Sequence, residues 1–282
     1  QRYTSVAYTP DPIGDLIFNG IAAQVGRSNR SSGVQADFSR HLNDTNTLRY
    51  GLFLCRETAV SNNHALVFPA DAQGNQTSTN PIGLIDDTRK NGTLAGAYVQ
   101  DEWTVSDKLT LNYGVRADHV NAFVSEGQLS PRIGLIYQWN DDTVVHAGYA
   151  RYFTPPPTEL IAPTDIALFQ GTTNALPSDA NTDVMSERSH YFDIGISHKI
   201  NSDFTLGLDS YYRIIRNLLD EGQFGQALVF SPFNYDRGRI YGLELTANYT
   251  HSDFSVYANL ATGKAEGKNI VSGQFNFSPE EL

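Results

Sequence analysis

The stretch LSPRIGLIYQWNDDTVVHAGYARY, residues 129–152, separates into two sets of alternating residues. One set is apolar and includes Ile133 and Leu135, while the set between them is mostly small, polar or charged and includes Arg132 and Gly134. Alternation of this kind indicates β-strand, because successive side chains of a strand point to opposite faces of the sheet. The stretch therefore predicts a hairpin with one apolar face and one polar face.

The same kind of turn occurs five times along the chain. Asn, Asp or Ser stands where a short side chain can hydrogen-bond the backbone, and apolar alternation resumes after it. The turn segments are LNDTNTL at 42–48, VSDKLTL at 105–111, WNDDTVV at 139–145, INSDFTL at 200–206 and THSDFSV at 250–256. Five hairpins predict strands at 33–41, 47–56, 93–104, 109–120, 129–139, 143–152, 187–199, 204–216, 237–250 and 254–265.

The connections at the opposite ends of these strands are mostly long. Tight turns at one end and long loops at the other are typical of transmembrane β-barrels, and a soluble sandwich has no reason to sort its connections in this way. The strands also exceed the usual soluble length of about 5–6 residues. Eleven residues tilted by about 45° cover roughly 26 Å, which is close to the apolar band of an outer-membrane barrel.

We therefore predict an all-β fold, an antiparallel meander of about ten long strands that forms part of a transmembrane β-barrel. The partial barrel covers residues 33–282, and residues 1–32 are expected to be an outer loop or a strand remnant. The long outer loops are predicted at 57–92, 153–186 and 217–236.

Two further features favour a membrane barrel over a soluble β-sandwich. Glycines recur on the polar face, where small residues suit the crowded inner wall of a barrel. They are Gly114, Gly134, Gly148, Gly195, Gly207 and Gly242.

Aromatic residues lie near strand ends on the apolar face, as in the girdles of membrane barrels. They are Trp103, Tyr137, Trp139, Phe204, Tyr212, Tyr249 and Phe254. The apolar face is therefore expected to contact lipid, and the polar face a wet lumen.

Charge and composition narrow the possible functions. The chain has 31 acidic and 20 basic residues and a net charge of -11, which disfavours nucleic acid as a partner. Cys55 is the single cysteine, so no internal disulfide or cysteine metal cluster can form. No stretch approaches the ~18 consecutive apolar residues of a transmembrane helix. If the protein crosses a membrane, it does so with strands.

The segment AYVQDEWTVSDKLTLNYGVRADH at 97–119 resembles the TonB-dependent outer-membrane receptors. The residues that match their strand–turn–strand pattern are Gln100, Asp101, Trp103, Leu109, Leu111, Gly114, Arg116 and Asp118. Four more segments resemble the family in order and spacing: LSPRIGLIY, HAGYARYFTPP, SERSHYFDIGI and GRIYGLEL. The resemblance covers about residues 32–282. It implies part of a 22-stranded barrel that is plugged by a separate N-terminal domain.

This resemblance implies energy-coupled uptake of a scarce nutrient across the outer membrane of a Gram-negative bacterium, such as an iron–siderophore chelate, cobalamin or a sugar. The implied partners are outer-membrane lipid, a plug domain, TonB and a small-molecule nutrient. Nothing in the chain resembles the plug or the terminal aromatic of such barrels, so we expect the plug and the last strands to lie outside this segment. The resemblance implies no catalytic residue, no cofactor and no resident metal.

The candidate solute contacts lie in the two predicted loops that carry apolar, amide and charged side chains. They are Phe153, Leu168, Phe169 and Gln170 in one loop, and His64, Phe68 and Arg89 in the other. The candidate lumen-wall charges are Arg116, Asp118, Arg132, Asp193, Lys199, Asp209, Arg213 and Glu244. We expect these charges to pair across neighbouring strands or with a plug, and His146 to be a wall residue.

Two other functions are compatible with the alternation alone. One is a self-contained outer-membrane barrel enzyme, a protease or lipase that uses His64 or His146. The other is a soluble β-sandwich that binds carbohydrate. The carboxylate pairs Asp86–Asp87 and Asp141–Asp142 could suggest a Ca²⁺ site or acid–base chemistry. The second pair falls in a predicted tight turn, where a structural role explains it.

Overall fold

A computed structural model describes residues 2–6, 21–122, 124–158, 168–175, 184–224 and 229–271. The strands are β1 Arg2–Val6, β2 Ile21–His41, β3 Asn46–Val67, β4 Ile82–Ser106, β5 Leu109–Asn121, β6 Ser125–Asn140, β7 Thr143–Thr154, β8 Glu187–Lys199, β9 Phe204–Phe224, β10 Val229–His251 and β11 Phe254–Ile270. Each strand pairs antiparallel with the next in one sheet, in the order β1 to β11.

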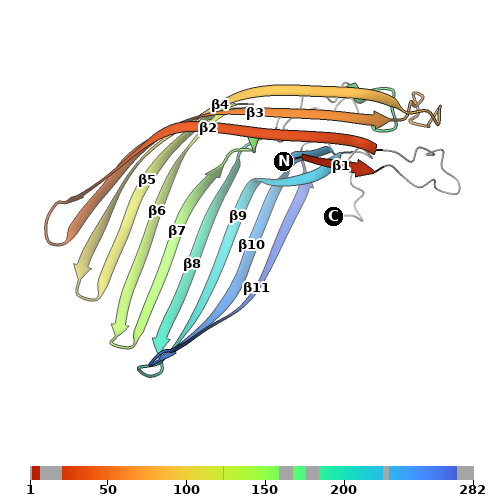
Figure 1. The fold of residues 1–282 in the computed structure, drawn as a ribbon. Coiled ribbons are helices and arrows are strands. Elements are labelled where there is room, and N and C mark those ends of the chain that lie inside the picture. The colour runs from red at the N-terminus through yellow and green to blue at the C-terminus, as the bar shows by residue number, and fades with distance from the viewer. Residues whose placement is uncertain are drawn as a thin grey trace.

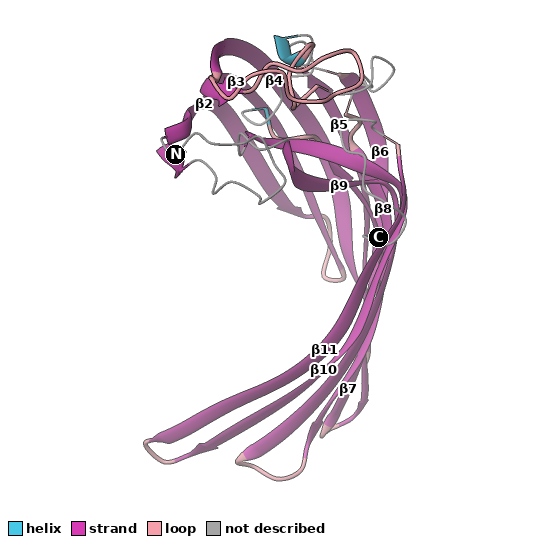
Figure 2. Ribbon diagram, turned by 90° about the vertical axis from the view of Figure 1, so that its right-hand side faces the viewer, coloured by secondary structure: helices cyan, strands magenta, loops and turns pink. Residues whose placement is uncertain are grey.

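The predicted meander of about ten long strands is confirmed by β2 to β11, which have between 12 and 25 residues each. The sheet curves into an open arch (Figures 1 and 2). The tight turns lie together at one end of the arch, and the long connections lie at the other. We call these the turn end and the loop end. Within the described residues, β1 pairs only with β2 and β11 only with β10, so the sheet is not closed by its own strands.

The turns close by the side-chain chemistry that the sequence predicts. The Oδ1 atom of Asn43 accepts hydrogen bonds from the backbone N–H groups of Thr45 and Asn46, at 2.9 and 2.8 Å. Asn201 Oδ1 does the same for the two residues that lead into β9, at 2.9 and 3.0 Å. The Oδ1 atom of Asn140 accepts from Asp142 N at 3.0 Å. The pair Asp141–Asp142 is thus part of a tight turn, as expected.

Two predicted loops are shorter than expected, because the strands that flank them extend further toward the loop end. The loop predicted at 57–92 is mostly strand, since β3 continues to Val67 and β4 begins at Ile82. Its alternation is hidden in sequence because small and polar residues are buried there, including Ser61 and Asn63. Most of the loop predicted at 217–236 likewise belongs to β9 and β10, and residues 225–228 lie outside the described residues.

The first 32 residues also differ from the prediction, because residues 21–32 belong to β2 and residues 2–6 form β1. Residues 7–20 lie outside the described residues. The third predicted loop, 153–186, falls between β7, which ends at Thr154, and β8, which begins at Glu187. Its residues 159–167 and 176–183 lie outside the described part of the chain.

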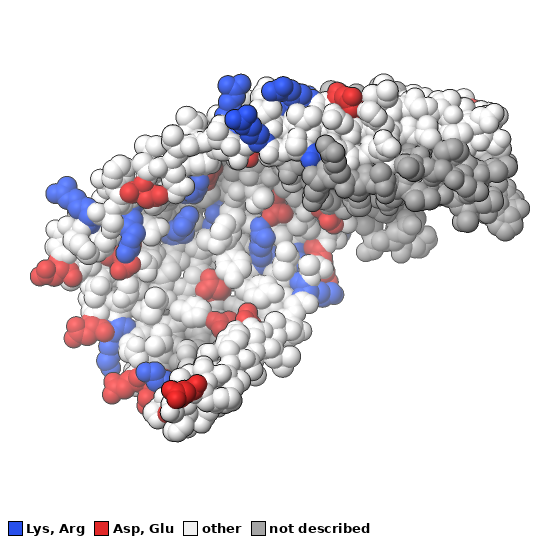
Figure 3. Space-filling view, viewed as in Figure 1, with Lys and Arg blue, Asp and Glu red and all other residues white. Residues whose placement is uncertain are grey.

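The two faces of the sheet differ as the alternation predicts. The convex face carries large apolar side chains that are mostly exposed, so that Ile194 is 58% exposed and Trp139 is 64% exposed. Basic and acidic side chains are interspersed in the hollow of the arch (Figure 3). The strand register places Arg132, Ala150, Tyr191 and Arg213 in one row across β6 to β9, and we call this the concave face.

The glycines of the concave face make room for large neighbouring side chains. A Cβ atom added to Gly195 would lie well inside 3.0 Å of Asp209 and His146, and one added to Gly242 would meet the Tyr211 ring. The predicted crowding of the inner wall is therefore present at these positions. Gly134 differs, because nothing lies within 4 Å of a Cβ placed there.

A small protein core lies at the loop end of the arch. Its buried members are Ala65, Val67, Phe169 and Phe233, and Leu84, Tyr235 and Ile270 pack against them. This core joins the 155–186 connection to β3 and β10, so it holds an outer loop against the barrel wall. Among the described residues, no helix has the length and apolar character needed to span a membrane.

Candidate functional site: the concave wall and the loop-end rim

The predicted wall charges share the concave face, but only some of them pair across strands. Arg213 forms an ion pair with Glu187 on the neighbouring strand β8. Arg116 instead pairs with Asp118 two residues further along β5, with 2.7 Å between Nε and Oδ1. The Arg116 guanidinium also lies 5.7 Å from the ring centre of Phe53, a favourable cation–π geometry.

His146 joins two of the predicted carboxylates. Its Nε2 atom lies 3.1 Å from Asp209 Oδ1 and 3.8 Å from Asp193 Oδ2, so one imidazole on β7 bridges β8 and β9. Gly148 and Gly195 leave the space into which these side chains extend. The arrangement makes His146 part of the wall. Among the described residues, no group of three or more His, Cys, Asp or Glu side chains is placed to hold a metal ion.

The remaining predicted wall charges have different surroundings. Glu244 accepts a hydrogen bond from the Asn259 side-chain amide on β11. Neither Arg132 nor Lys199 has an ion-pair partner among the described side chains. Arg132 therefore keeps its guanidinium available to a group that enters the hollow of the arch.

A groove of about 440 Å³ lies on the wall around Arg132. Its concave lining includes Gly134 and Gly148, the two tyrosines Tyr152 and Tyr191, and Asp193. The lack of a side chain at Gly134 leaves its floor open. The groove thus combines one cation, aromatic rings and a carboxylate, which can bind a polar solute or a protein segment through several different contacts.

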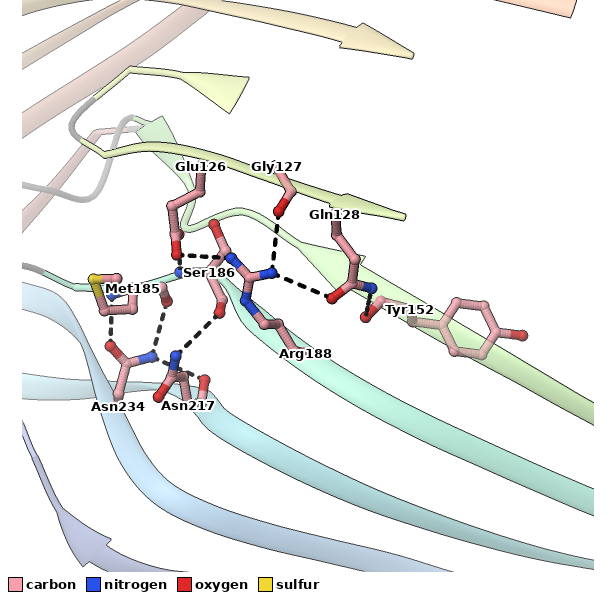
Figure 4. Close-up of polar contacts among 9 residues, drawn as sticks. All are labelled: Glu126, Gly127, Gln128, Tyr152, Met185, Ser186, Arg188, Asn217 and Asn234. Carbon is pink, nitrogen blue, oxygen red and sulfur yellow. Dashed lines mark hydrogen bonds and ion pairs between the residues drawn. The ribbon is translucent and has the colours of Figure 1, made fainter. Parts of the chain in front are cut away.

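The loop-end rim contains a buried polar network that the sequence did not predict (Figure 4). Glu126 accepts from Arg188 Nη2 at 3.0 Å and from the backbone N–H of Ser186 at 2.7 Å. Arg188 also donates to the carbonyl of Gly127 at 3.1 Å, and its guanidinium lies 5.3 Å from the ring centre of Phe153. These contacts fix the point at which the long connection enters β8.

Asn234 also holds the chain in place where it enters β8. Its Oδ1 atom accepts from Met185 N at 2.8 Å, while Nδ2 donates to the carbonyls of Met185 and Asn217 at 3.0 and 2.9 Å. Ser186 is fully buried and Asn234 is 3% exposed, so water does not compete for these bonds. In the sequence, this region stood out only because the segment SERSHYFDIGI resembles the TonB-dependent receptors. That resemblance did not indicate the hydrogen bonds.

Two loop segments meet above the wall. The backbone N–H of Ala70 donates to the Gly171 carbonyl at 2.8 Å, and that of Thr173 donates to the Phe68 carbonyl at 2.9 Å. The described residues 168–175 of the long connection and the 68–81 connection therefore form one cap. Asp71 closes a turn in this cap by accepting from the backbone N–H of Gln73 and of Asn75, both at 2.9 Å.

The structure separates the predicted solute contacts into four groups. Phe68 and Phe169 are 3% and 6% exposed, so their rings support the cap and face no solvent. This is a correction to their predicted role, since a ring buried in protein cannot contact a solute. Leu168 is exposed beside them, as is the side chain of Gln170. Phe153 packs under Arg188 at the rim.

His64 and Arg89 lie in strands β3 and β4 rather than in a loop. The buried residues of β3 alternate with its exposed residues, and His64 belongs to the exposed set, with its Nε2 atom 3.2 Å from Asp87 Oδ1. Both side chains therefore point away from the buried interior. They do not line the hollow into which Arg132 and Tyr152 face.

Comparison with known proteins identifies a family of β-barrels and a curated relative. The family model described as TonB dependent receptor-like, beta-barrel matches residues 1–280. A curated relative, the TonB-dependent transporter Oar of Myxococcus xanthus, is 32% identical over 83 residues, which cover 26% of this chain and 8% of that protein.

Two solved structures have the same fold. The FrpB iron transporter from Neisseria meningitidis, in its apoprotein form, matches with a TM-score of 0.62 and 17% identity, over 92% of this chain and 39% of that chain. The pyoverdine outer membrane receptor FpvA from Pseudomonas aeruginosa matches with a TM-score of 0.60 and 15% identity, over 96% of this chain and 41% of that chain. The chain thus spans about two fifths of the length of these solved structures.

Proposed function

Because the chain belongs to the TonB-dependent receptor-like β-barrel family, we propose that it forms part of the wall and outer loops of a receptor that imports a scarce nutrient across the outer membrane. The observation that carries this proposal is the two-faced sheet, with uncovered apolar side chains outside and charges inside. A wall of this kind suits lipid on one side and a solvated passage on the other.

The rest of the receptor would complete this wall. An open sheet in lipid leaves unpaired N–H and C=O groups at its edges, and each such group costs several kcal/mol. We therefore infer that further strands close the barrel beside β1 and β11, and that a plug domain occupies the hollow and receives energy from TonB. The proposed location is the outer membrane of a Gram-negative bacterium.

We propose an iron–siderophore chelate as the first solute to test and cobalamin as the second. The support for iron is that FrpB is an iron transporter and FpvA a pyoverdine receptor. In this chain the proposed contacts are Arg132, Tyr152 and Tyr191 in the wall groove, with Leu168 and Gln170 on the cap above. The wall has no catalytic task in this proposal, since the solute passes through unchanged.

The alternative functions have weaker support. A soluble β-sandwich requires two packed sheets, whereas the described strands form one continuous sheet. A barrel hydrolase would need a nucleophile or an activated water beside a histidine. The ion-pair partners of His146 are Asp193 and Asp209 and that of His64 is Asp87, and none of these is a hydroxyl or thiol nucleophile.

The test is uptake by the full-length protein in a strain that lacks it. Uptake of radiolabelled ferric siderophores and of cobalamin is measured with the wild type, with Arg132→Ala in the groove, and with Lys199→Ala near the turn end as the matched control. We expect uptake of one iron chelate, at least a tenfold weaker apparent affinity for Arg132→Ala, and little change for Lys199→Ala. Uptake of cobalamin alone would contradict iron, and uptake of neither by a folded receptor would contradict both solutes.

A further inference from the structure

A cluster of five cations lies on the convex face of β9, β10 and β11 near the loop end. We call it the outer basic patch, and its members are Arg216, Arg237, Arg239, Lys264 and Lys268. They line a groove of about 930 Å³. The chain as a whole has a net charge of -11, so the charge of this patch is opposite in sign to that of the chain.

The strand register fixes the side of the sheet on which the patch lies. Arg216 is two residues from Ile214, and Arg237 and Arg239 continue the alternation of Tyr241 and the leucines that follow on β10. Those apolar side chains are exposed on the convex face. The Arg239 guanidinium lies 5.9 Å from the ring centre of Tyr241, which agrees with a shared face. The patch therefore faces outward, away from the hollow.

Cations stand directly opposite one another in this part of the sheet. Arg188 on β8 is opposite Arg216, Arg216 is opposite Arg237, and Arg237 is opposite Lys268. Like charges in directly opposed positions destabilise a sheet. Arg188 is neutralised by Glu126, whereas no buried carboxylate among the described side chains pairs with the other three cations of the row.

Among the described residues, the five cations of this patch share two carboxylates. Glu266 forms ion pairs with both Arg239 and Lys264. Asp236 contacts its chain neighbour Arg237, with 3.4 Å between Oδ2 and Nε. The cations on β9 and at the end of β11 have no carboxylate at ion-pair distance among the described residues. The patch thus has an excess of positive charge that an external anion can neutralise.

The depth of the patch follows from the aromatic residues below it. The rings of Tyr212 and Tyr241 stack on the convex face with 6.0 Å between their centres, and Phe204 begins the same strand at the turn end. The eight steps from Phe204 to Tyr212 span roughly 26 Å along the strand at ~3.3 Å per residue. At a tilt of about 45° this is roughly 19 Å across the membrane, so both rings lie within or at the edges of the ~25 Å apolar band.

Arg216 lies four residues beyond Tyr212 and therefore roughly 9 Å further from the membrane centre, at ~3.3 Å per residue and a tilt of about 45°. That depth is where the phosphate-bearing headgroups of the outer leaflet lie. Beyond the patch, Asn217 and Asn269 adopt φ angles of 53° and 58°, and β9 bends there (Figure 1). The patch therefore lies just before this irregularity in β9 and β11.

We propose that the outer basic patch binds the phosphate groups of an anionic membrane lipid from the outside of the barrel. Guanidinium groups match phosphate geometry and bind it in a bidentate manner, while lysine supplies a point charge. The ligand class is a lipid headgroup that carries at least two phosphates, because three positive charges remain after the two local carboxylates. This inference rests on the proposed placement in the outer membrane, but it does not depend on which solute is transported.

The test compares two variants of the full-length protein that each remove two positive charges. Arg216→Gln with Arg237→Gln changes the patch, and Arg40→Gln with Lys108→Gln removes the same charge at the turn end. Binding of bisphosphorylated lipid A, monophosphorylated lipid A and phosphatidylcholine is measured in mixed detergent micelles by native mass spectrometry. Soluble pyrophosphate serves as the competitor without acyl chains. Heat-modifiable gel migration verifies that each variant is folded.

We expect bisphosphorylated lipid A to bind the wild type in preference to phosphatidylcholine. Each cation near an anionic membrane surface contributes a factor of about five, so the patch variant should bind roughly thirtyfold more weakly. The turn-end variant should bind like the wild type. Equal loss in both variants would overturn the proposal, and so would displacement by pyrophosphate at the concentration at which the lipid binds. Solute uptake by the patch variant should remain intact, which separates this result from a failure of the transport proposal.

Discussion

The two faces of the sheet are formed by the same strands, yet their side chains have different surroundings. On the convex face, large apolar side chains such as Ile194 remain more than half exposed, because little protein covers them. On the concave face, side chains such as His146 and Asp209 lie across glycines and contact one another. The difference indicates that the convex face is stabilised by its surroundings and the concave face by internal contacts. Three substitutions and one change of pH test these local environments, and the largest effect is expected on the convex face.

Replacing Ile194 with lysine should destabilise the barrel the most. The residue lies near the middle of β8, where a lysine on the lipid face of a membrane barrel costs about 2–4 kcal/mol. The matched control is Ser197→Lys on the concave face of the same strand, which should cost less than about 1 kcal/mol. Urea unfolding of the full-length protein in lipid vesicles measures both. Similar losses for the two variants would mean that the faces do not meet different solvents.

Gly195→Val should have the next largest effect. Its Cβ and methyl groups would clash with Asp209 and His146, and overpacking of this kind costs about 1–3 kcal/mol. Gly134→Val is the control, because open space surrounds that position and valine favours strand. The same unfolding measurement should place the control within about 0.5 kcal/mol of the wild type. A neutral Gly195→Val would show that the wall is looser than the contacts suggest.

Glu126→Gln should weaken the loop-end rim by a smaller amount. Its carboxylate is 9% exposed and accepts from Arg188 and from Ser186 N, and hydrogen bonds to charged groups contribute about 1.5–3 kcal/mol in such places, part of which the amide retains. Hydrogen exchange in residues 184–190 should therefore quicken. Glu102→Gln is the control, since its pair with Arg49 is 39% exposed and surface pairs contribute about 0–1 kcal/mol. Unchanged exchange for Glu126→Gln would argue that the network does not anchor the loop.

Acidification should have the smallest effect, in the cap. Hydrogen bonds from Asn75, mainly from its backbone N–H, lower the pKa of Asp71 below its ordinary value. Because the folded-state pKa is lowered, the turn is stabilised fully above the ordinary carboxyl pKa and loses that stabilisation as the pH falls through the lowered value. Exchange of the Gln73 and Asn75 amides should quicken only in that acidic window. Asp71→Asn should abolish the pH dependence, and a persistent dependence in that variant would assign it to another group.

The sequence predicts the central part of this sheet well, because turn chemistry and alternation act over short distances. The Asn43 and Asn201 turns and the strands around them are examples. It fails at the loop end, where Ser61 and Asn63 are buried although they are polar. Their burial depends on loops that pack over them, and a local pattern cannot encode that packing. The same limit applies to the rim network around Arg188.

The candidate site was predictable to a similar extent. Strand parity places Arg132 and Arg213 on the concave face, as the register now verifies. Phe68 and Phe169 were predicted to contact the solute, but both are buried. An apolar loop residue can either contact a solute or support the loop, and only the packed structure distinguishes the two. The outer basic patch could not be predicted from the sequence either. Its cations come from three strands, and only the strand register brings them side by side.

The most direct test of the two-faced wall uses spin labels at adjacent positions in the full-length protein in lipid vesicles. With Cys55 replaced by serine, single cysteines at Ile133 and Arg132 place labels at the same depth on opposite faces. The label at 133 should be relaxed mainly by oxygen dissolved in the bilayer, and the label at 132 mainly by a water-soluble nickel chelate. The reverse pattern, or equal accessibility at both positions, would contradict the assignment of the convex face to lipid.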